Sequence, residues 1–158
     1  MILGQRLRRG SVGSPRGASR LVGDSLAILK RLVPAAGARV LVRADSAFYG
    51  HATVAAALTA GAEVSVTVKM DKAVKAAIAG IDEKAWTGIR YPQAIFDEDT
   101  GTWISKAEVA EVPFTAFTSR KKTERVPGRL VVRRIPELNP QDTDQPMLFG
   151  THRFHAFF

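Results

Sequence analysis

Residues 39–50 of this 158-residue chain read Arg-Val-Leu-Val-Arg-Ala-Asp-Ser-Ala-Phe-Tyr-Gly, and this stretch decides the expected fold. Its first half, 39–44, is short, rich in β-branched residues and bounded by turn signals, which predicts a strand that ends just before Asp45. An alanine-rich helix is expected over 51–60, with Gly61 just beyond its last turn, where a left-handed backbone is common. The strand therefore leads through an acidic residue into a helix.

The segments on either side alternate between helical and strand patterns. Apolar residues recur at helical spacing over 18–33, whereas 63–68 alternates apolar and polar residues as a half-buried strand does. Asp71 is placed to cap a further helix that holds Val74 and Ile78 on one side. The order helix, strand, helix, strand, helix predicts an α/β fold with a partly parallel sheet.

The composition and pattern of the sequence change after Trp86. Prolines, aspartates and glycines separate four β-prone runs, at 102–105, 109–118, 129–135 and 147–158. We therefore expect three parts: a basic N-terminal segment (1–17), a core (18–86) and a β-rich part (87–158). Because the last residues lie within an apolar β-prone run, we expect the β-rich part to be cut at its C-terminal end.

Composition excludes several classes of protein. Hydrophobic residues make up 46% of the chain, enough for a core, and the absence of cysteine excludes disulfide scaffolds and thiolate zinc sites. No apolar run approaches the roughly 18–20 residues that span a bilayer, and arginines occupy the start of the chain where a signal peptide would be apolar. We expect a soluble cytoplasmic protein with no membrane partner.

The net charge of +8 is unevenly distributed. Residues 1–79 carry 12 basic and 4 acidic side chains, whereas 80–158 carry 11 of each. Within the second half, a cluster of seven bases against one acid falls at 120–134, and 119–125 reads as a hairpin loop. The seven bases are Arg120, Lys121, Lys122, Arg125, Arg129, Arg133 and Arg134. They either line a DNA backbone or are solvated loop and edge-strand charges that oppose aggregation.

Asp45 has two interpretations. At the carboxyl end of a strand in an open α/β sheet it lies where such sheets place ligands, and a carboxylate suits Mg²⁺ or Mn²⁺. Alternatively, its side chain caps the turn that follows. The spacing of the residues leaves both roles open.

Residues 39–50 resemble the second-aspartate motif of DDE transposases from bacterial insertion sequences. The likeness continues through EVSVTVKMDKAV (63–74), KAAIAGIDEKAW (75–86), TWISKAEVAEV (102–112) and GRLVVRRIPE (128–137). In kind, the chain looks most like the actinobacterial group, whose ribonuclease H-like core is interrupted by a β-rich insertion. The resemblance implies an incomplete ribonuclease H-like mixed sheet with flanking helices, followed by a β-rich insertion.

The resemblance also implies a function. Such enzymes hold two Mg²⁺ or Mn²⁺ ions on an Asp, Asp, Glu triad and use them for DNA cleavage and strand transfer. On this match Asp45 is the second aspartate, catalytic and metal-ligating. The only acid before it is Asp24, in the expected helix 18–33, and no later acid lies on a long helix beyond the insertion.

We therefore expect a transposase fragment that is not catalytically competent alone. Its expected partners are the DNA of insertion-sequence ends and an intact transposase. The alternative is a non-catalytic, basic DNA-binding remnant that regulates such an enzyme. A third interpretation is a small α/β protein whose likeness to transposases is accidental.

Overall fold

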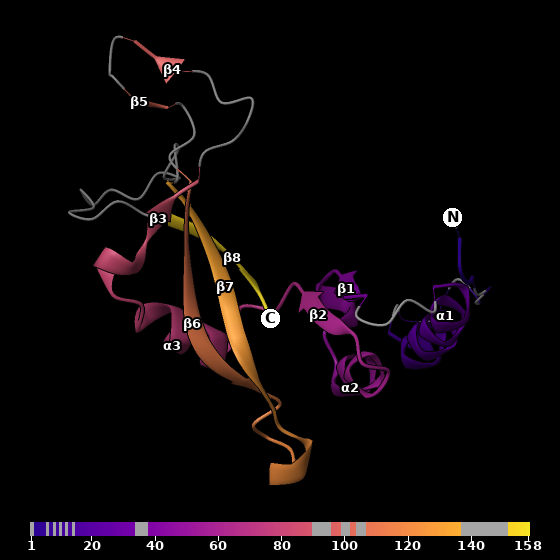
Figure 1. Cartoon of the computed structure of the whole chain (residues 1–158). Helices are drawn as coiled ribbons and strands as arrows, with labels where there is room; N and C mark the ends of the chain where they lie inside the picture. Colours follow the sequence, from indigo (N-terminus) through magenta and orange to yellow (C-terminus); the bar gives the residue numbers. More distant parts are fainter. Residues whose placement is uncertain are drawn as a thin grey trace. The chain divides into compact units, whose positions relative to one another are not determined.

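The computed structural model describes residues 2–5, 7, 9, 11, 13, 15–33, 38–89, 96–98, 102–103, 107–136 and 152–158 (Figure 1). Helices and strands are both present, which confirms the expected α/β class. The chain forms two compact units from interleaved segments. The first contains Met1–Lys69, Thr115–Val126 and Phe158, and the second contains Met70–Phe114 and Pro127–Phe157.

The first unit contains the parallel pair that the sequence predicts. Strands β1 (Leu41–Ala44) and β2 (Glu63–Val66) run parallel, from Leu41 opposite Glu63 to Ala44 opposite Val66. A connection through α2 (His51–Thr59) joins them, as parallel strands require. Helix α1 (Ala18–Leu32) precedes β1 and packs on α2.

Local chemistry explains where the helices of this unit begin and end. Helix α1 follows Gly17, whose φ of 77° lies in the left-handed region that glycine adopts at little cost. After α2, Gly61 adopts a φ of 80°, and the amide of Ala62 donates to the carbonyl of Ala57 at 3.0 Å. This glycine-ended helix is the one expected from the sequence.

The described part of the second unit contains the helix α3 and most of an antiparallel sheet. Helix α3 (Lys72–Ala79) begins at Asp71, whose Oδ1 accepts a hydrogen bond from the Val74 amide at 2.9 Å, and this confirms the predicted cap. The sheet has the strand order β3-β6-β7-β8. Its strands are β3 (Thr87–Gly88), β6 (Glu108–Ala116), β7 (Val126–Pro136) and β8 (His152–Phe157).

Shorter elements connect these strands. The 3₁₀ turn η2 (Glu83–Ala85) leads into β3, and η3 (Lys122–Glu124) joins β6 to β7. Strands β4 (Phe96–Asp97) and β5 (Thr102–Trp103) form a separate antiparallel pair. Each of the four β-prone runs thus contains a strand, and a turn does lie at the expected hairpin.

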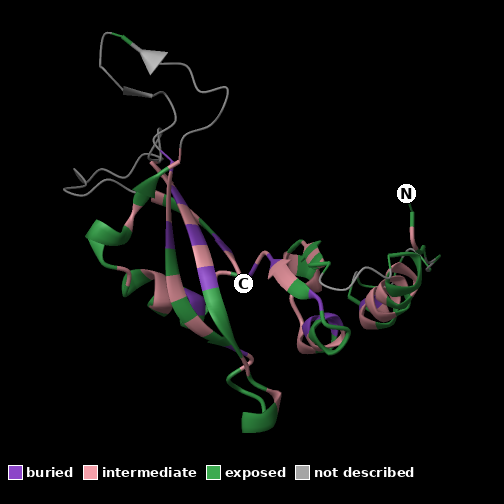
Figure 2. Ribbon diagram, viewed as in Figure 1, coloured by how far each residue is buried: buried purple, intermediate pink, exposed green. Residues whose placement is uncertain are grey.

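Buried and partly exposed residues alternate along the middle of β7 (Figure 2). Leu130, Val132 and Arg134 are buried, whereas Val131 and Arg133 are partly exposed. This alternation is the period of two expected for a strand with one face on a core. An arginine at a buried position of the series therefore needs partners inside the protein.

Candidate functional site

Asp45 lies immediately after β1, at the carboxyl end of the parallel pair. Its backbone is extended, and its Oδ1 accepts a hydrogen bond from the Ala47 amide at 2.8 Å. The side chain therefore caps η1 (Ser46–Phe48), which is one of the two roles open from the sequence. The residue as a whole is exposed to solvent.

Among the residues that the structure describes, the carboxylates that a pair of metal ions would need are not assembled around Asp45. Within the described ranges, no group of three or more His, Cys, Asp or Glu side chains is placed to hold a metal ion. Asp24 lies on α1, where its Oδ2 is 3.8 Å from Nε of Arg20 in an exposed ion pair. One carboxylate cannot balance the charge of two divalent ions, so the described residues do not fit a two-metal centre.

Aromatic packing connects the segment after Asp45 to the hairpin between β6 and β7. The ring of Tyr49 stacks on Phe117, with centroids 5.2 Å apart and planes at 27°. His51 meets the same Phe117 ring edge-on at 5.4 Å, and Phe158 lies 6.3 Å from Tyr49. These residues belong to the first unit, so the base of the hairpin is packed beside the Asp45 segment.

Phe117 adopts a backbone conformation that is rare for its side chain. Its φ is 60°, in the left-handed region, and its carbonyl accepts a hydrogen bond from the Arg120 amide at 2.9 Å. A bulky residue is held there only when the surrounding structure compensates for the strain. The two ring contacts of Phe117 provide that compensation and set where the hairpin turns.

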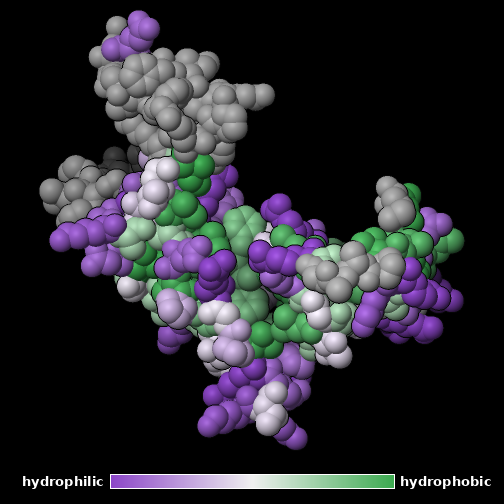
Figure 3. Space-filling model, in the orientation of Figure 1, coloured by the Kyte–Doolittle hydropathy of each residue, from purple (hydrophilic) through white to green (hydrophobic). Residues whose placement is uncertain are grey.

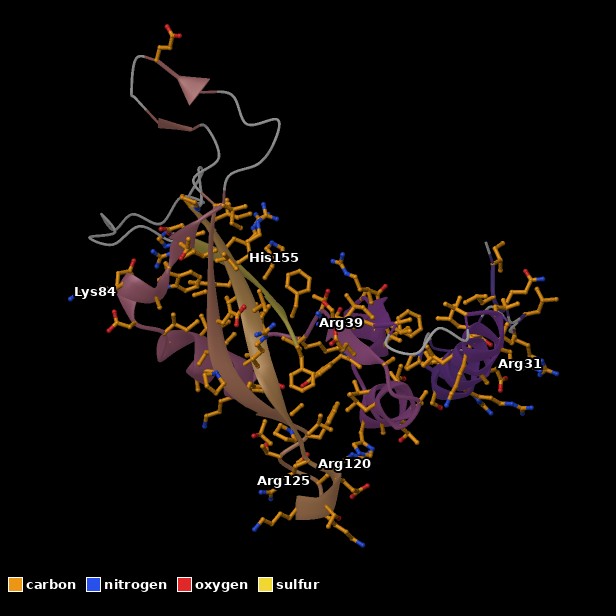
Figure 4. All side chains as sticks on the ribbon, in the orientation of Figure 1. Arg31, Arg39, Lys84, Arg120, Arg125 and His155 are labelled. Atoms are coloured by element: carbon orange, nitrogen blue, oxygen red, sulfur yellow. The ribbon has the colours of Figure 1, made fainter. Side chains whose placement is uncertain are left out.

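Four of the seven predicted DNA-contacting residues come together at the tip of this hairpin. Arg120, Lys121, Lys122 and Arg125 are all exposed, and Figure 3 shows hydrophilic residues gathered there. Arg120 pairs with Glu124 at 3.2 Å, and Nε of Arg125 donates to the Arg120 carbonyl at 3.3 Å (Figure 4). We call these four residues the basic tip.

The other three predicted residues lie on β7 in the second unit. Arg129 is exposed and pairs with Glu111 at 3.1 Å, and Arg133 is half-buried opposite His155 of β8. Arg134 is different, because its side chain is only 10% exposed. The three therefore do not form a single cationic surface with equal access to solvent.

The guanidinium of Arg134 is held by two carboxylates and an aromatic ring. It forms a two-pronged ion pair with Glu83, at 2.5 and 2.9 Å, and its Nε donates to Glu108 at 2.6 Å. Its Cζ also lies 4.3 Å from the centroid of Trp86. These interactions use the donors that a phosphate would need, so we assign Arg134 a structural role and leave it out of the proposed DNA surface.

Electrostatics within this cluster follow from the short contacts. The hydrogen bonds from Arg134 lower the pKa of Glu83 below its ordinary value of 4.5, with a smaller opposing effect from burial. The pKa of Arg134 is raised, first by its hydrogen bond to Glu83 and also by Glu108. Both groups are therefore ionised at neutral pH, and the cluster ties η2 to the sheet.

Two features of this arrangement were not expected from the sequence. The contact of Phe117 with Tyr49 joins residues 68 positions apart, and nothing local in the sequence indicates it. The partners of Arg134 are similarly remote, although an arginine in phase with Leu130 and Val132 is a usable signal. Such a position predicts a buried, paired cation rather than a surface one.

Comparison of the chain with protein-family models, curated proteins and solved structures found no match. Among the described helices, none combines the length and the apolar character needed to cross a lipid bilayer.

Proposed function

We propose that the chain is part of a DDE transposase with a ribonuclease H-like fold, and that it contacts DNA through the basic tip. The supporting observation is that aromatic packing holds together the Asp45 segment and the hairpin that carries this tip. Asp45 follows a parallel strand, where α/β sheets place functional groups. In the whole enzyme, Asp45 would be one of three carboxylates that hold Mg²⁺ or Mn²⁺.

DNA binding through the basic tip has a measurable salt dependence. Each phosphate that a lysine or arginine neutralises contributes about −0.9 to the slope of log K against log salt concentration. Replacing Lys121, Lys122 and Arg125 by glutamine removes three exposed charges from the basic tip. If all three contact phosphates, the slope should become shallower by about 2.7.

Fluorescence anisotropy of a labelled DNA duplex, titrated between about 0.05 and 0.2 M salt, measures this slope. The matched control replaces Lys30, Lys72 and Lys84, which are exposed lysines on other elements, by glutamine. The control has the same net charge as the basic-tip variant, so it separates the effect of where the lysines lie from the effect of net charge on DNA binding. Equal slopes for the two triple variants would refute the assignment of DNA contact to the basic tip.

The role proposed for Asp45 is tested separately, because the capping interaction must be preserved. Asp45→Asn retains an oxygen that accepts from the Ala47 amide but loses the charge that attracts a divalent ion. We expect Mn²⁺ to broaden the NMR signals of residues around Asp45 in the unsubstituted chain and much less in Asp45→Asn. Equal broadening in both chains would exclude Asp45 as a ligand.

A second candidate function is supported by the finding that, among the described residues, no three His, Cys, Asp or Glu side chains are grouped to hold a metal ion. A chain that binds DNA without a metal centre could occupy transposon ends and so regulate an intact transposase. We expect no cleavage of duplex DNA by this chain with Mg²⁺ or Mn²⁺. Cleavage that disappears in Asp45→Asn would show instead that the chain is itself a nuclease.

A further inference from the structure

The second unit contains a pocket that has no part in the proposed DNA contact. Its volume is about 560 Å³, within the range of roughly 300–1,000 Å³ that is typical of small-ligand sites. Residues of α3, of the segment after it, of β7 and of β8 line it. Most of the lining is apolar, including Met70, Ile78, Ile81, Trp86 and Phe154.

Two aromatic rings form part of the pocket wall. Trp86 and Phe154 have ring centroids 6.1 Å apart and planes inclined at 50°. The guanidinium of Arg134 lies over the Trp86 ring, which fixes the position of that ring. Rings held at such an angle offer both a face and an edge to a third aromatic ring, the arrangements that aromatic groups prefer. The wall therefore favours a flat aromatic ligand over a branched aliphatic one.

The charges of the lining residues differ in their availability. Arg134 is neutralised by Glu83 and Glu108, at contact distances of 2.5 to 2.9 Å. Lys75 lies on α3, is exposed, and forms no ion pair with any carboxylate in the described part of the chain. Lys75 is thus the lining cation that can pair with a negatively charged group of a ligand. The Glu83 carboxylate disfavours a ligand that carries several negative charges.

We propose that this pocket binds a small aromatic carboxylate, with the ring against Trp86 and Phe154 and the carboxylate on Lys75. Apolar burial of the ring supplies most of the affinity, and the single charge orients the ligand. The inference does not depend on DNA binding, because none of the four residues of the basic tip lines the pocket.

The test uses 1-naphthaleneacetate as the probe and the full chain as the protein. The indole N–H signal of Trp86 reports binding in a ¹H–¹⁵N spectrum, and Trp103→Phe identifies that signal because the chain has 2 tryptophans. We expect a saturable shift of the Trp86 signal. Lys75→Gln should weaken binding about fivefold, the effect of one exposed charge pair, and Lys72→Gln should leave it unchanged.

Two further comparisons distinguish binding in this pocket from nonspecific hydrophobic binding. Ala79 lines the pocket and is exposed, so Ala79→Phe should block the probe, whereas Ala76→Phe on the same helix lies outside the lining and should not. The uncharged 1-naphthaleneethanol should bind more weakly and should not distinguish Lys75→Gln from the unsubstituted chain. Probe binding that survives Ala79→Phe, or that is insensitive to Lys75→Gln, would overturn the proposal.

Discussion

Replacing Arg134 by methionine should destabilise the protein by about 2–3 kcal/mol. Methionine retains an unbranched apolar side chain but removes the charge and every donor of the guanidinium. Loss of the contact with Trp86 accounts for about 1 kcal/mol. The rest comes from Glu108, whose side chain is 32% exposed and would lose its guanidinium partner where water replaces that partner only in part.

The exposure of Glu83 keeps this estimate below the full cost of breaking a buried ion pair, about 3–5 kcal/mol. Its side chain is 76% exposed, so water replaces the lost guanidinium. Urea unfolding followed by tryptophan fluorescence and circular dichroism measures the change. The midpoint should fall while the slope with denaturant stays constant, because the surface exposed on unfolding hardly changes.

Arg129→Met is the matched control on the same strand. Arg129 pairs with Glu111 at 3.1 Å, but both side chains are more than half exposed, and such pairs contribute at most about 1 kcal/mol. A double-mutant cycle should give a clear coupling for Arg134 with Glu108 and almost none for Arg129 with Glu111. Similar destabilisation by Arg134→Met and Arg129→Met would refute the structural role assigned to the Arg134 cluster.

Three further predictions concern acid sensitivity and local backbone structure. Because the folded state lowers the pKa of Glu83, its contribution to stability is complete above about pH 4.5 and is lost as the pH falls below that value. The unfolding free energy of the unsubstituted chain should therefore fall more steeply between about pH 6 and pH 3 than that of Glu83→Gln. Urea unfolding at a series of pH values measures both, and the same pH dependence in the two chains would contradict this. Gly61→Ala should destabilise the protein by about 1 kcal/mol because the φ of Gly61 is 80°. Gly23→Ala inside α1, with open space around the new methyl group, should stabilise the protein by about 0.5–1 kcal/mol. Thermal unfolding measures both changes, and equal shifts of the melting temperature would exclude a conformational origin. Asp71→Ala removes the cap of α3 and should lower the free energy of unfolding by about 1 kcal/mol, whereas Asp71→Asn should lower it much less. Urea unfolding detects this difference, and equal stability of the two variants would show that the cap is unimportant.

The local elements of the chain were predictable because their causes are local. Helix α2 with its glycine ending and the cap at Asp71 follow from periodicity and neighbouring residues. The parallel pairing of β1 with β2 was indicated by the order strand, helix, strand. The hairpin between β6 and β7 was predictable for the same reason, since polar residues interrupt two β-prone runs.

The candidate site was predictable only in part. Asp45 stands at the end of β1 as expected, and its capping role was one of two that the spacing allowed. The cluster of seven bases was visible in the sequence, but only the phase of Arg134 with Leu130 and Val132 indicated how the cluster divides. Four residues form the exposed basic tip, whereas Arg134 is buried against Glu83 and Glu108. The number of charges in a stretch of sequence does not show which face of a strand each cation occupies when the sheet pairing is not known.

Patterns in the sequence predicted the helices α1, α2 and α3, the position of Asp45 and the concentration of positive charge at 120–134. They also predicted every described strand except β3 and β4, which lie outside the expected β-prone runs. Each of these depends on residues a few positions apart, where backbone preference and side-chain period act directly. The packing of Phe117 on Tyr49 and the link that Arg134 makes between η2 and the sheet are visible only in the folded chain. Those contacts depend on the burial of distant side chains against one another, which the order of residues along the chain does not specify locally.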